Sequence, residues 1–455
     1  MSYQFSNFGQ HLGSGSGIGE LMDDLGHALA SGGPDLKMLG GGQPARIPEM
    51  NAVWRRRLEE LMEEMGGLER ALTTYDPPGG NPHFIEAIAT LFRKTFGWEI
   101  GPENVGITSG GQTAFYFLFN LLAGEMPDGS RRKILLPLVP EYIGYANQGV
   151  GGDLFRAVPP LIEKTGPHEF KYRVDFDQLV VTPDIAAICA SRPTNPTGNV
   201  LTDEEIGHLS AIAKQHNIPL IIDNAYGAPF PGIIFADATP FWENHVVLTL
   251  SLSKLGLPGT RTGIVIGPPE IIRALGSMSA IAGLSNPNIG QQITLPLIRS
   301  GEILRLSREV VQPFYQEKCQ LARHAAIEAF GDDIEWYMHR SEGALFLWFW
   351  FPGLKITSQE LYERLKKRDV LVIPGHHFFF GHADPNWCHR HECIRVSYAM
   401  DEAVVRDGLR LIAEEVRHAQ LGCSAPTQAD RPAARSSSLR PNSSAPHGAE
   451  LPALQ

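Results

Sequence analysis

The sequence predicts an α/β protein with two domains: a larger one built on a mostly parallel sheet sandwiched by helices, and a smaller α+β one. The length of 455 residues exceeds what one hydrophobic core usually organises. The hydrophobic content of 43% supplies material for two cores. Short apolar runs that end in turn or polar residues alternate with helical patterns, and this alternation is typical of a parallel sheet.

The first part of the chain predicts the large domain. Helical spacing of apolar residues covers 48–67 and 110–124, and the second pattern is apolar enough for a buried helix. The helix expected over 202–217 opens on Thr202 with Glu205 three residues later, the signature of a capping box. Short apolar runs predict the strands, at 103–108, 133–139, 185–191, 218–223, 245–250 and 264–267.

The later part predicts the smaller domain. A long helical region spans about Glu302 to Phe330, and "ALFLWFWF" and "IRVSYAM" are interpreted as strands. From about Leu421 the chain is rich in Ser, Pro and Ala, so we expect a disordered tail. We expect these divisions: 1–50 as an N-terminal arm with part of the small domain, 51–310 as the large domain, 311–420 as the small domain and 421–455 as the tail.

Polar and aromatic groups follow the predicted strands at their carboxyl ends, where ligands bind in open parallel sheets. The loops are "SGGQTAF", "PEYIGY", "RPTNPTG", "DNAY" and "SLSK", in chain order. Together they suit a ligand with an anionic end, a flat ring and a carbonyl. Gly110, Gly111 and Gln112 stand at a helix start, which favours phosphate, and Ser251 and Arg261 offer a hydroxyl and a fork-shaped cation to the same group.

The ordered set "RPTNPTG", "DNAY" and "SLSK" with a downstream arginine resembles the pyridoxal-phosphate enzymes of the aspartate aminotransferase superfamily, fold type I, from about Leu39 to Ala399. The resemblance implies a seven-stranded large sheet and pyridoxal phosphate as cofactor. Lys254 would form a Schiff base with the cofactor aldehyde and later move a proton as a base. Asp223 would keep the ring nitrogen protonated. Tyr226 and Asn195 would bind the ring hydroxyl, and Tyr142 would stack on the ring.

The same resemblance assigns further contacts. Ser253 joins Ser251, Arg261 and the Gly110–Gln112 turn among the expected cofactor ligands. Arg395 and Asn195 would bind the substrate α-carboxylate, and Gly41 and Gly42 would close over it. Tyr75 matches a tyrosine that reaches the cofactor phosphate of a neighbouring subunit, so the resemblance implies a homodimer.

The spacing from Lys254 to Arg261 is one residue shorter than the family's usual spacing, and Asn224 stands where many members have Glu. The shortened loop and the "PEYIGYANQG" stretch resemble the branch of the family that uses valine and pyruvate. We therefore expect an aliphatic amino acid as donor, pyruvate as acceptor, and an apolar pocket lined by Phe378 to Phe380.

Other functions stay open on the sequence. Another enzyme of this fold could be an aminotransferase for aromatic or varied substrates, or a β-lyase that cleaves C–S bonds. Some domains of this fold are ligand sensors fused to a DNA-binding module. Such a fusion needs a basic helix-turn-helix region before the domain, and none fits into the first forty residues.

Charge and cysteine content limit the possible binding partners and the cellular compartment. A net charge of −11 argues against nucleic acid or an anionic membrane as partner. The N-terminus lacks a basic region followed by an apolar core, and no apolar run is long enough to span a bilayer. Five scattered cysteines fit a reducing compartment. We expect a cytoplasmic protein that binds amino acids and 2-oxo acids.

Two further patterns carry no site prediction. The stretch "HHFFFGHADPNWCHRHEC" gathers histidines and cysteines, yet their spacing fits no paired zinc motif, so we expect no metal. The stretch "GSGSGIGE" resembles a dinucleotide fingerprint, but no strand precedes it.

Overall fold

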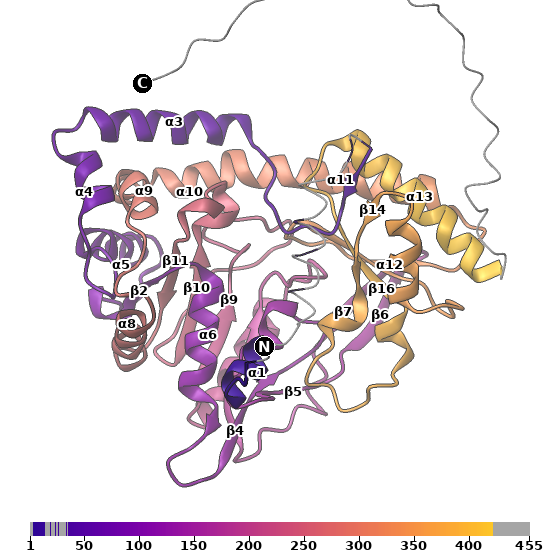
Figure 1. The fold of residues 1–455 in the computed structure, drawn as a ribbon, viewed down its shortest axis with the longest axis horizontal. Coiled ribbons are helices and arrows are strands. Elements are labelled where there is room, and N and C mark those ends of the chain that lie inside the picture. Colours follow the sequence, from indigo (N-terminus) through magenta and orange to yellow (C-terminus); the bar gives the residue numbers. More distant parts are fainter. Residues whose placement is uncertain are drawn as a thin grey trace, which may run out of the picture.

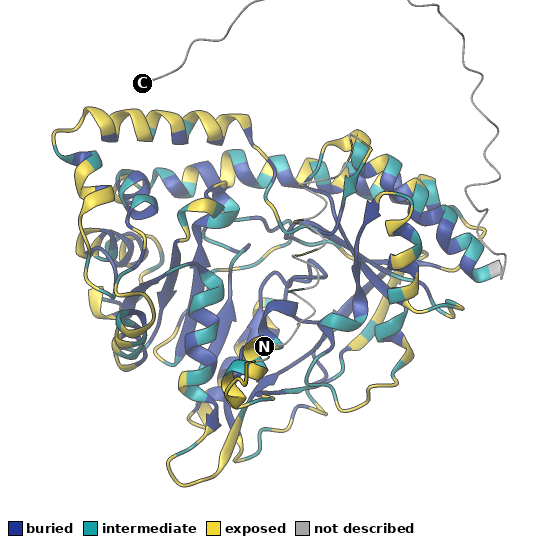
Figure 2. Cartoon of the chain, in the orientation of Figure 1, coloured by how far each residue is buried: buried dark blue, intermediate teal, exposed yellow. Residues whose placement is uncertain are grey.

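The structure is a computed structural model, which describes residues 3–13, Gly19, Asp23, Gly26, Gly33 and residues 35–421. The tail predicted to be disordered lies, beyond Leu421, outside the described residues. Two large sheets and one two-stranded sheet organise the described chain, and helices cover the outer sides of the large sheets (Figure 1). Exposed surface is concentrated on the outer helices, while the strands between them are buried (Figure 2). The α/β class with a second, smaller body is therefore confirmed.

The larger sheet has eight strands within the described chain. In sheet order they are β2 (Val105–Thr108), β11 (Gly263–Ile266), β10 (Val246–Ser251), β9 (Leu220–Asp223), β8 (Ile185–Ser191), β4 (Arg131–Leu136) and β3 (Gly124–Glu125), with β5 (Phe155–Ala157) also paired to β4. Five of them, from β10 to β4 and β5, pair in parallel. β11 is antiparallel to both β10 and β2. The short β3 adds an eighth strand to the seven that were expected.

In the described chain, four helices pack on the strands of this sheet: α5 (Pro82–Phe96), α6 (Gly111–Leu122), α7 (Asp203–Gln215) and α8 (Pro269–Gly283). Outside them, α9 (Ile289–Ser300) packs on α5, and α3 (Pro48–Glu63), α4 (Gly67–Thr73) and α10 (Glu302–Leu306) pack on α9. The predicted capping box of α7 is present: the Thr202 hydroxyl accepts from Glu205 N–H at 3.1 Å, and the Glu205 carboxylate accepts from Thr202 N–H at 2.8 Å. It fixes the start of the helix that leads into β9.

The second sheet draws strands from distant parts of the chain. In order it contains β15 (Ile373–Pro374), β16 (Cys393–Ser397), β13 (Phe346–Trp350), β12 (Tyr337–His339), β7 (Glu169–Arg173) and β6 (Leu161–Gly166). The β6–β7 hairpin lies within the range predicted as large domain, yet β7 pairs in parallel with β12. The domain boundaries remain a prediction. This hairpin lies within 51–310 by residue number, but it belongs to the second sheet by its strand pairing.

Helices join and cover the second sheet. After α10 the π-helical turn η5 (Ser307–Val311) continues into α11 (Gln312–Phe330), and α12 (Ser358–Lys366) and α13 (Glu402–Leu421) follow. The predicted helix over 302–330 is thus confirmed, with one wider turn inside it. The short α1 (Asn7–Gly13) is exposed. Within the described residues, no helix is both long and apolar enough to span a lipid bilayer.

The N-terminal segment connects the two bodies. β1 (Lys37–Met38) pairs in parallel with β14 (Val370–Leu371), and Ser397 N–H donates to Leu39 C=O at 2.6 Å. The chain then passes to α3, where Trp54 Nε1 donates to Leu255 C=O at 3.0 Å. Residues 40–44 therefore cross the space between the sheets with both ends anchored.

Candidate active site

A cavity of about 320 Å³ opens beyond the carboxyl ends of β8, β9 and β10, where the first sheet faces the second. Its wall contains twelve of the residues predicted from the sequence. They are Gly42, Gly111, Gln112, Tyr142, Asn195, Asp223, Tyr226, Ser251, Ser253, Lys254, Arg261 and Arg395. Strand ends of a parallel sheet thus converge on one site, as expected.

Lys254 lies in the 3₁₀ turn η3 (Leu252–Leu255), directly after β10. Its Nζ donates to Gly42 C=O at 2.6 Å and lies 5.0 Å from the centre of the Tyr226 ring. Burial lowers the pKa of the Lys254 amine to about 8, and the nearby Arg395 guanidinium acts in the same direction. A substantial fraction of this amine is therefore neutral, and able to act as nucleophile or base, near pH 8.

Asp223 ends β9 and is buried. One carboxylate oxygen accepts from Ala225 N–H at 2.9 Å, and the other accepts from the Tyr145 hydroxyl. Burial raises the pKa of Asp223, although both hydrogen bonds oppose that change. A cation placed against this carboxylate from the cavity would offset the cost of its burial.

Arg395 reaches the cavity from β16 in the second sheet and is only 3% exposed. Its Nη1 donates to the Asn195 side chain and its Nη2 to Gly40 C=O, both at 2.6 Å. The guanidinium lies 4.1 Å from the centre of the Phe346 ring. Its Nε has no hydrogen-bond partner among the described residues, and burial lowers its pKa to about 10. A buried guanidinium that has free N–H groups and, in the described part of the chain, no acid partner suits a small carboxylate.

The start of α6 and Arg261 form the anion-binding corner of the cavity. The N–H groups of the first helical turn, from Gly111 onward, have no carbonyl partners inside the helix. Gly110 has φ of +90°, and a Cβ there would lie 2.2 Å from Nη2 of Arg261. Glycine at this position therefore lets the guanidinium pack against the helix start. The Ser251 hydroxyl, which accepts from Ser253 N–H at 3.1 Å, faces the same cavity.

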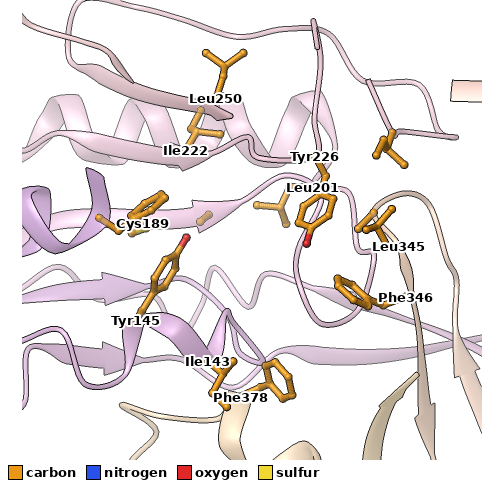
Figure 3. Packing of buried hydrophobic residues seen from close by; sticks show 14 of the residues in the cluster. Ile143, Tyr145, Cys189, Leu201, Ile222, Tyr226, Leu250, Leu345, Phe346 and Phe378 are labelled. Atoms are coloured by element: carbon orange, nitrogen blue, oxygen red, sulfur yellow. The ribbon is translucent and has the colours of Figure 1, made fainter. Parts of the chain in front are cut away.

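Aromatic and amide side chains complete the wall. The Tyr142 ring packs edge-on against Tyr145 at 5.2 Å, and Tyr226 packs edge-on against Phe346 at 5.9 Å. Figure 3 shows Tyr226 facing Phe346, with Tyr145 on the side of Cys189. Gln112 donates to Gly144 C=O at 2.8 Å, so α6 is tied to the turn that carries Tyr142.

Some predicted residues lie elsewhere. Tyr75 is 78% exposed and does not line the cavity. Gly41 stays outside the wall, between Gly40 and Gly42, and Gly110 contacts the site through Arg261. The expectation that Phe378 to Phe380 line a substrate pocket is wrong: they are absent from the wall, and Phe378 instead packs 5.4 Å from Arg395. The apolar wall comes from Phe115, Ile143 and Leu250.

Sequence reasoning missed two buried groups behind the cavity. Tyr145 binds Asp223, and Glu141 accepts hydrogen bonds from Tyr142 N–H and from Ser191. Both belong to the stretch "PEYIGY", from which only Tyr142 was selected. Among the described residues, the His- and Cys-rich segment forms no group of three or more side chains able to hold a metal ion.

The sequence of this chain is similar to a family model and to a known aminotransferase. The family model for aminotransferase class I and II matches residues 162–412. The valine–pyruvate aminotransferase of Escherichia coli K12 is 46% identical over 415 residues, which cover 91% of this chain and 98% of that protein.

Solved structures are similar over nearly their whole length. The structure of valine–pyruvate aminotransferase from Salmonella typhimurium LT2 is 44% identical, with a TM-score of 0.81 over 88% of this chain and 99% of that one. A structure from Psychrobacter arcticum 273-4, assigned as an amino-acid aminotransferase, is 43% identical, with a TM-score of 0.89 over 92% and 99% of the two chains.

Proposed function

The chain belongs to the class I and II aminotransferases, which use pyridoxal phosphate, and from this premise we propose that it transfers the amino group of valine to pyruvate. The products are 3-methyl-2-oxobutanoate and alanine. The observation that carries the proposal is the convergence of Lys254, Asp223 and Arg395 on one cavity. The identity to the Escherichia coli enzyme over almost its full length supports this choice of substrates.

The residues of the cavity fit pyridoxal phosphate. Asp223 is a buried carboxylate whose two described hydrogen bonds come from neutral donors, so a protonated ring nitrogen would supply the missing positive charge. Gly110 leaves room for Arg261 at the start of α6, where a phosphate would find N–H groups and a guanidinium together. Tyr142, Tyr226 and Asn195 would hold the ring and its hydroxyl from the remaining sides.

Each of the chain's reactive groups would have one task. When bound, pyridoxal phosphate supplies an aldehyde that captures the amino group and a ring that takes up electrons from the reacting carbon. Lys254 would carry the proton that leaves the substrate Cα, because its amine is partly neutral near pH 8. Arg395 would orient the substrate through its α-carboxylate, with Gly42 closing the cavity above it.

A homodimer is the proposed assembly. Tyr75 is exposed and follows α4 closely in the chain, and α3, α4 and the turn between them carry exposed apolar side chains. These are Leu58, Met62, Met65 and Leu72. A second copy of the chain on this face would cover them and bring its Tyr75 to the neighbouring phosphate. Sedimentation of the purified protein measures the assembly, and a monomer at micromolar concentration would contradict it.

The cytoplasm is the proposed location. Four cysteines in the described chain are unpaired, which suits a reducing compartment.

The decisive experiment mixes the purified protein with pyridoxal phosphate, valine and pyruvate and measures alanine. Formation of alanine together with 3-methyl-2-oxobutanoate supports the proposal. A panel of amino donors against pyruvate ranks valine among aromatic and longer side chains. Absence of alanine, with ammonia and pyruvate released from cystathionine, would assign the protein to the β-lyases instead.

A further inference from the structure

Glu141 is a buried carboxyl group for which the proposed chemistry has no task. It lies in the loop between β4 and the 3₁₀ turn η2 (Ile143–Tyr145), and only 1% of its surface is exposed. Glutamate is rarely buried in this way unless its carboxyl group is bonded on several sides. The partners of Glu141 therefore indicate what it does.

Three donors meet this one carboxyl group. Oε1 accepts from Tyr142 N–H at 2.9 Å and contacts the Ser191 hydroxyl at 2.5 Å. Oε2 accepts from Ser191 N–H at 3.0 Å. The backbone N–H of Glu141 in turn donates to Phe378 C=O at 2.9 Å. One residue thus joins the loop after β4, the end of β8 and a loop of the second body.

Two of these three segments carry a side chain that lines the cavity, and the third packs against one. The first presents Tyr142 to the cavity, and the second leads from Ser191 into the turn that presents Asn195. The third carries Phe378, whose ring lies 5.4 Å from the Arg395 guanidinium. Resting on the proposed function, we propose that Glu141 is a positioning residue: its carboxyl group fixes Tyr142 and the Asn195 turn in the places from which they hold the cofactor ring.

The charges around Glu141 make this role sensitive to pH. Asp223 faces it from β9, Tyr145 from η2 and Cys189 from β8. Burial raises the pKa of Glu141 to about 8, and the Asp223 carboxylate adds to that rise. Glu141 is therefore mainly neutral at pH 7, when either it or Ser191 can donate in their short contact. Above pH 8 it becomes a second buried anion behind the ring.

The variant Glu141→Gln tests the role while keeping the shape of the side chain. An amide has one accepting oxygen, so its NH₂ group must face either Tyr142 N–H or Ser191 N–H, and one of these donors loses its acceptor. Glu205→Gln is the matched control. Glu205 is also buried and accepts from two backbone N–H groups, those of Val174 and Thr202, but it caps α7 and does not line the cavity.

Three quantities are measured for both variants. They are the dissociation constant of pyridoxal phosphate from the cofactor-free protein, the pH midpoint of the visible band of the lysine-bound cofactor, and the Tm. We expect Glu141→Gln to weaken cofactor binding roughly ten- to a hundred-fold, because one buried N–H donor beside the site is left without its acceptor. We also expect its midpoint to move to higher pH, because a displaced Asn195 would no longer donate to the ring oxygen beside the bound amine, and loss of that donor favours the protonated form. Glu205→Gln should lower the Tm alone.

The outcomes separate this proposal from the proposed function. Both proposals would be overturned if the wild-type protein with pyridoxal phosphate showed no visible band. They would also be overturned if the band persisted in Lys254→Ala. A normal wild-type protein, with cofactor affinity and midpoint unchanged in Glu141→Gln, would overturn only the role of Glu141. If Glu141→Gln does not fold, Ser191→Ala removes one of the three donors and should weaken cofactor binding about three- to tenfold; unchanged binding in that variant would refute the role.

Discussion

Replacement of Arg395 by alanine tests how the substrate is held. The guanidinium has five N–H groups, and its bonds to Asn195 and Gly40 use two of them. The remaining N–H groups include Nε, which has no partner among the described residues. A carboxylate can therefore bind as a bidentate pair while both existing bonds persist. Arg395→Ala should slow every substrate with an α-carboxylate.

The size of the loss follows from the two new hydrogen bonds. A hydrogen bond to a charged group contributes about 1.5–3 kcal/mol, so a pair is worth about 3–6 kcal/mol. Each ~1.4 kcal/mol is a factor of ten in rate. We therefore expect kcat/KM for valine to fall by roughly 10²- to 10⁴-fold in Arg395→Ala. The kcat/KM of Arg395→Lys for valine should lie between the values of the wild type and of Arg395→Ala, because lysine keeps the positive charge but cannot form the bidentate pair.

The assay compares valine with 2-methylpropylamine, which has the same side chain and no carboxylate. Single-turnover loss of the cofactor's visible band gives both rates without the second substrate. Arg395→Ala should leave the rate for the amine within about threefold of wild type, since the lost interaction of about 3–6 kcal/mol concerns only the carboxylate. Equal losses for valine and for the amine would show that Arg395 supports the fold and not the substrate.

Three other expectations concern the cofactor. Lys254→Ala should show no added mass after treatment with pyridoxal phosphate and borohydride, and a reduced adduct on this variant would move the linkage to another amine. Uptake of cofactor by the apo-protein should rise up to tenfold per pH unit towards pH 8 and level off above it, because the pKa of Lys254 is about 8; a flat profile would contradict this. Gly110→Ala should weaken phosphate binding and cost about 1–3 kcal/mol of stability, since its φ is +90° and Arg261 occupies the space. Urea unfolding that matches wild type would refute the strain.

The site residues that could be predicted stand at strand ends in short polar loops. Each of Asp223, Lys254 and Asn195 stands at or just after the end of an apolar run that is recognisable as a strand from its own residues. Such a position can be selected from the nearby sequence alone, without knowledge of distant contacts. Glu141 and Tyr145 could not be selected in the same way. A glutamate between Pro140 and Tyr142 is most simply interpreted as a solvated loop residue, and its burial depends on β8 and on Phe378, which are distant in sequence.

The same limit applies to the fold. Alternating patterns predicted the parallel strands from β4 to β10, but the direction of β11 follows from the loop before it. Residues 252–262 form only 3₁₀ turns, and a parallel crossover needs a dozen or more residues, usually a helix. The length of this loop is therefore a signal in the sequence for an antiparallel β11. The pairing of β7 with β12 was not accessible, because period and turn residues do not show which sheet a hairpin joins.

The β6–β7 hairpin has a consequence for synthesis of the chain. The ribosome completes residues 161–173 long before residues 337–339, the strand beside which the hairpin finally lies. Until then β7 presents an unpaired edge on a nascent polypeptide whose first sheet can already assemble. Open edges of this kind invite contact with other chains. The polar residues "EKT" of β6 are exposed in the folded protein. In the nascent chain they would keep the hairpin soluble until β12 has been synthesised.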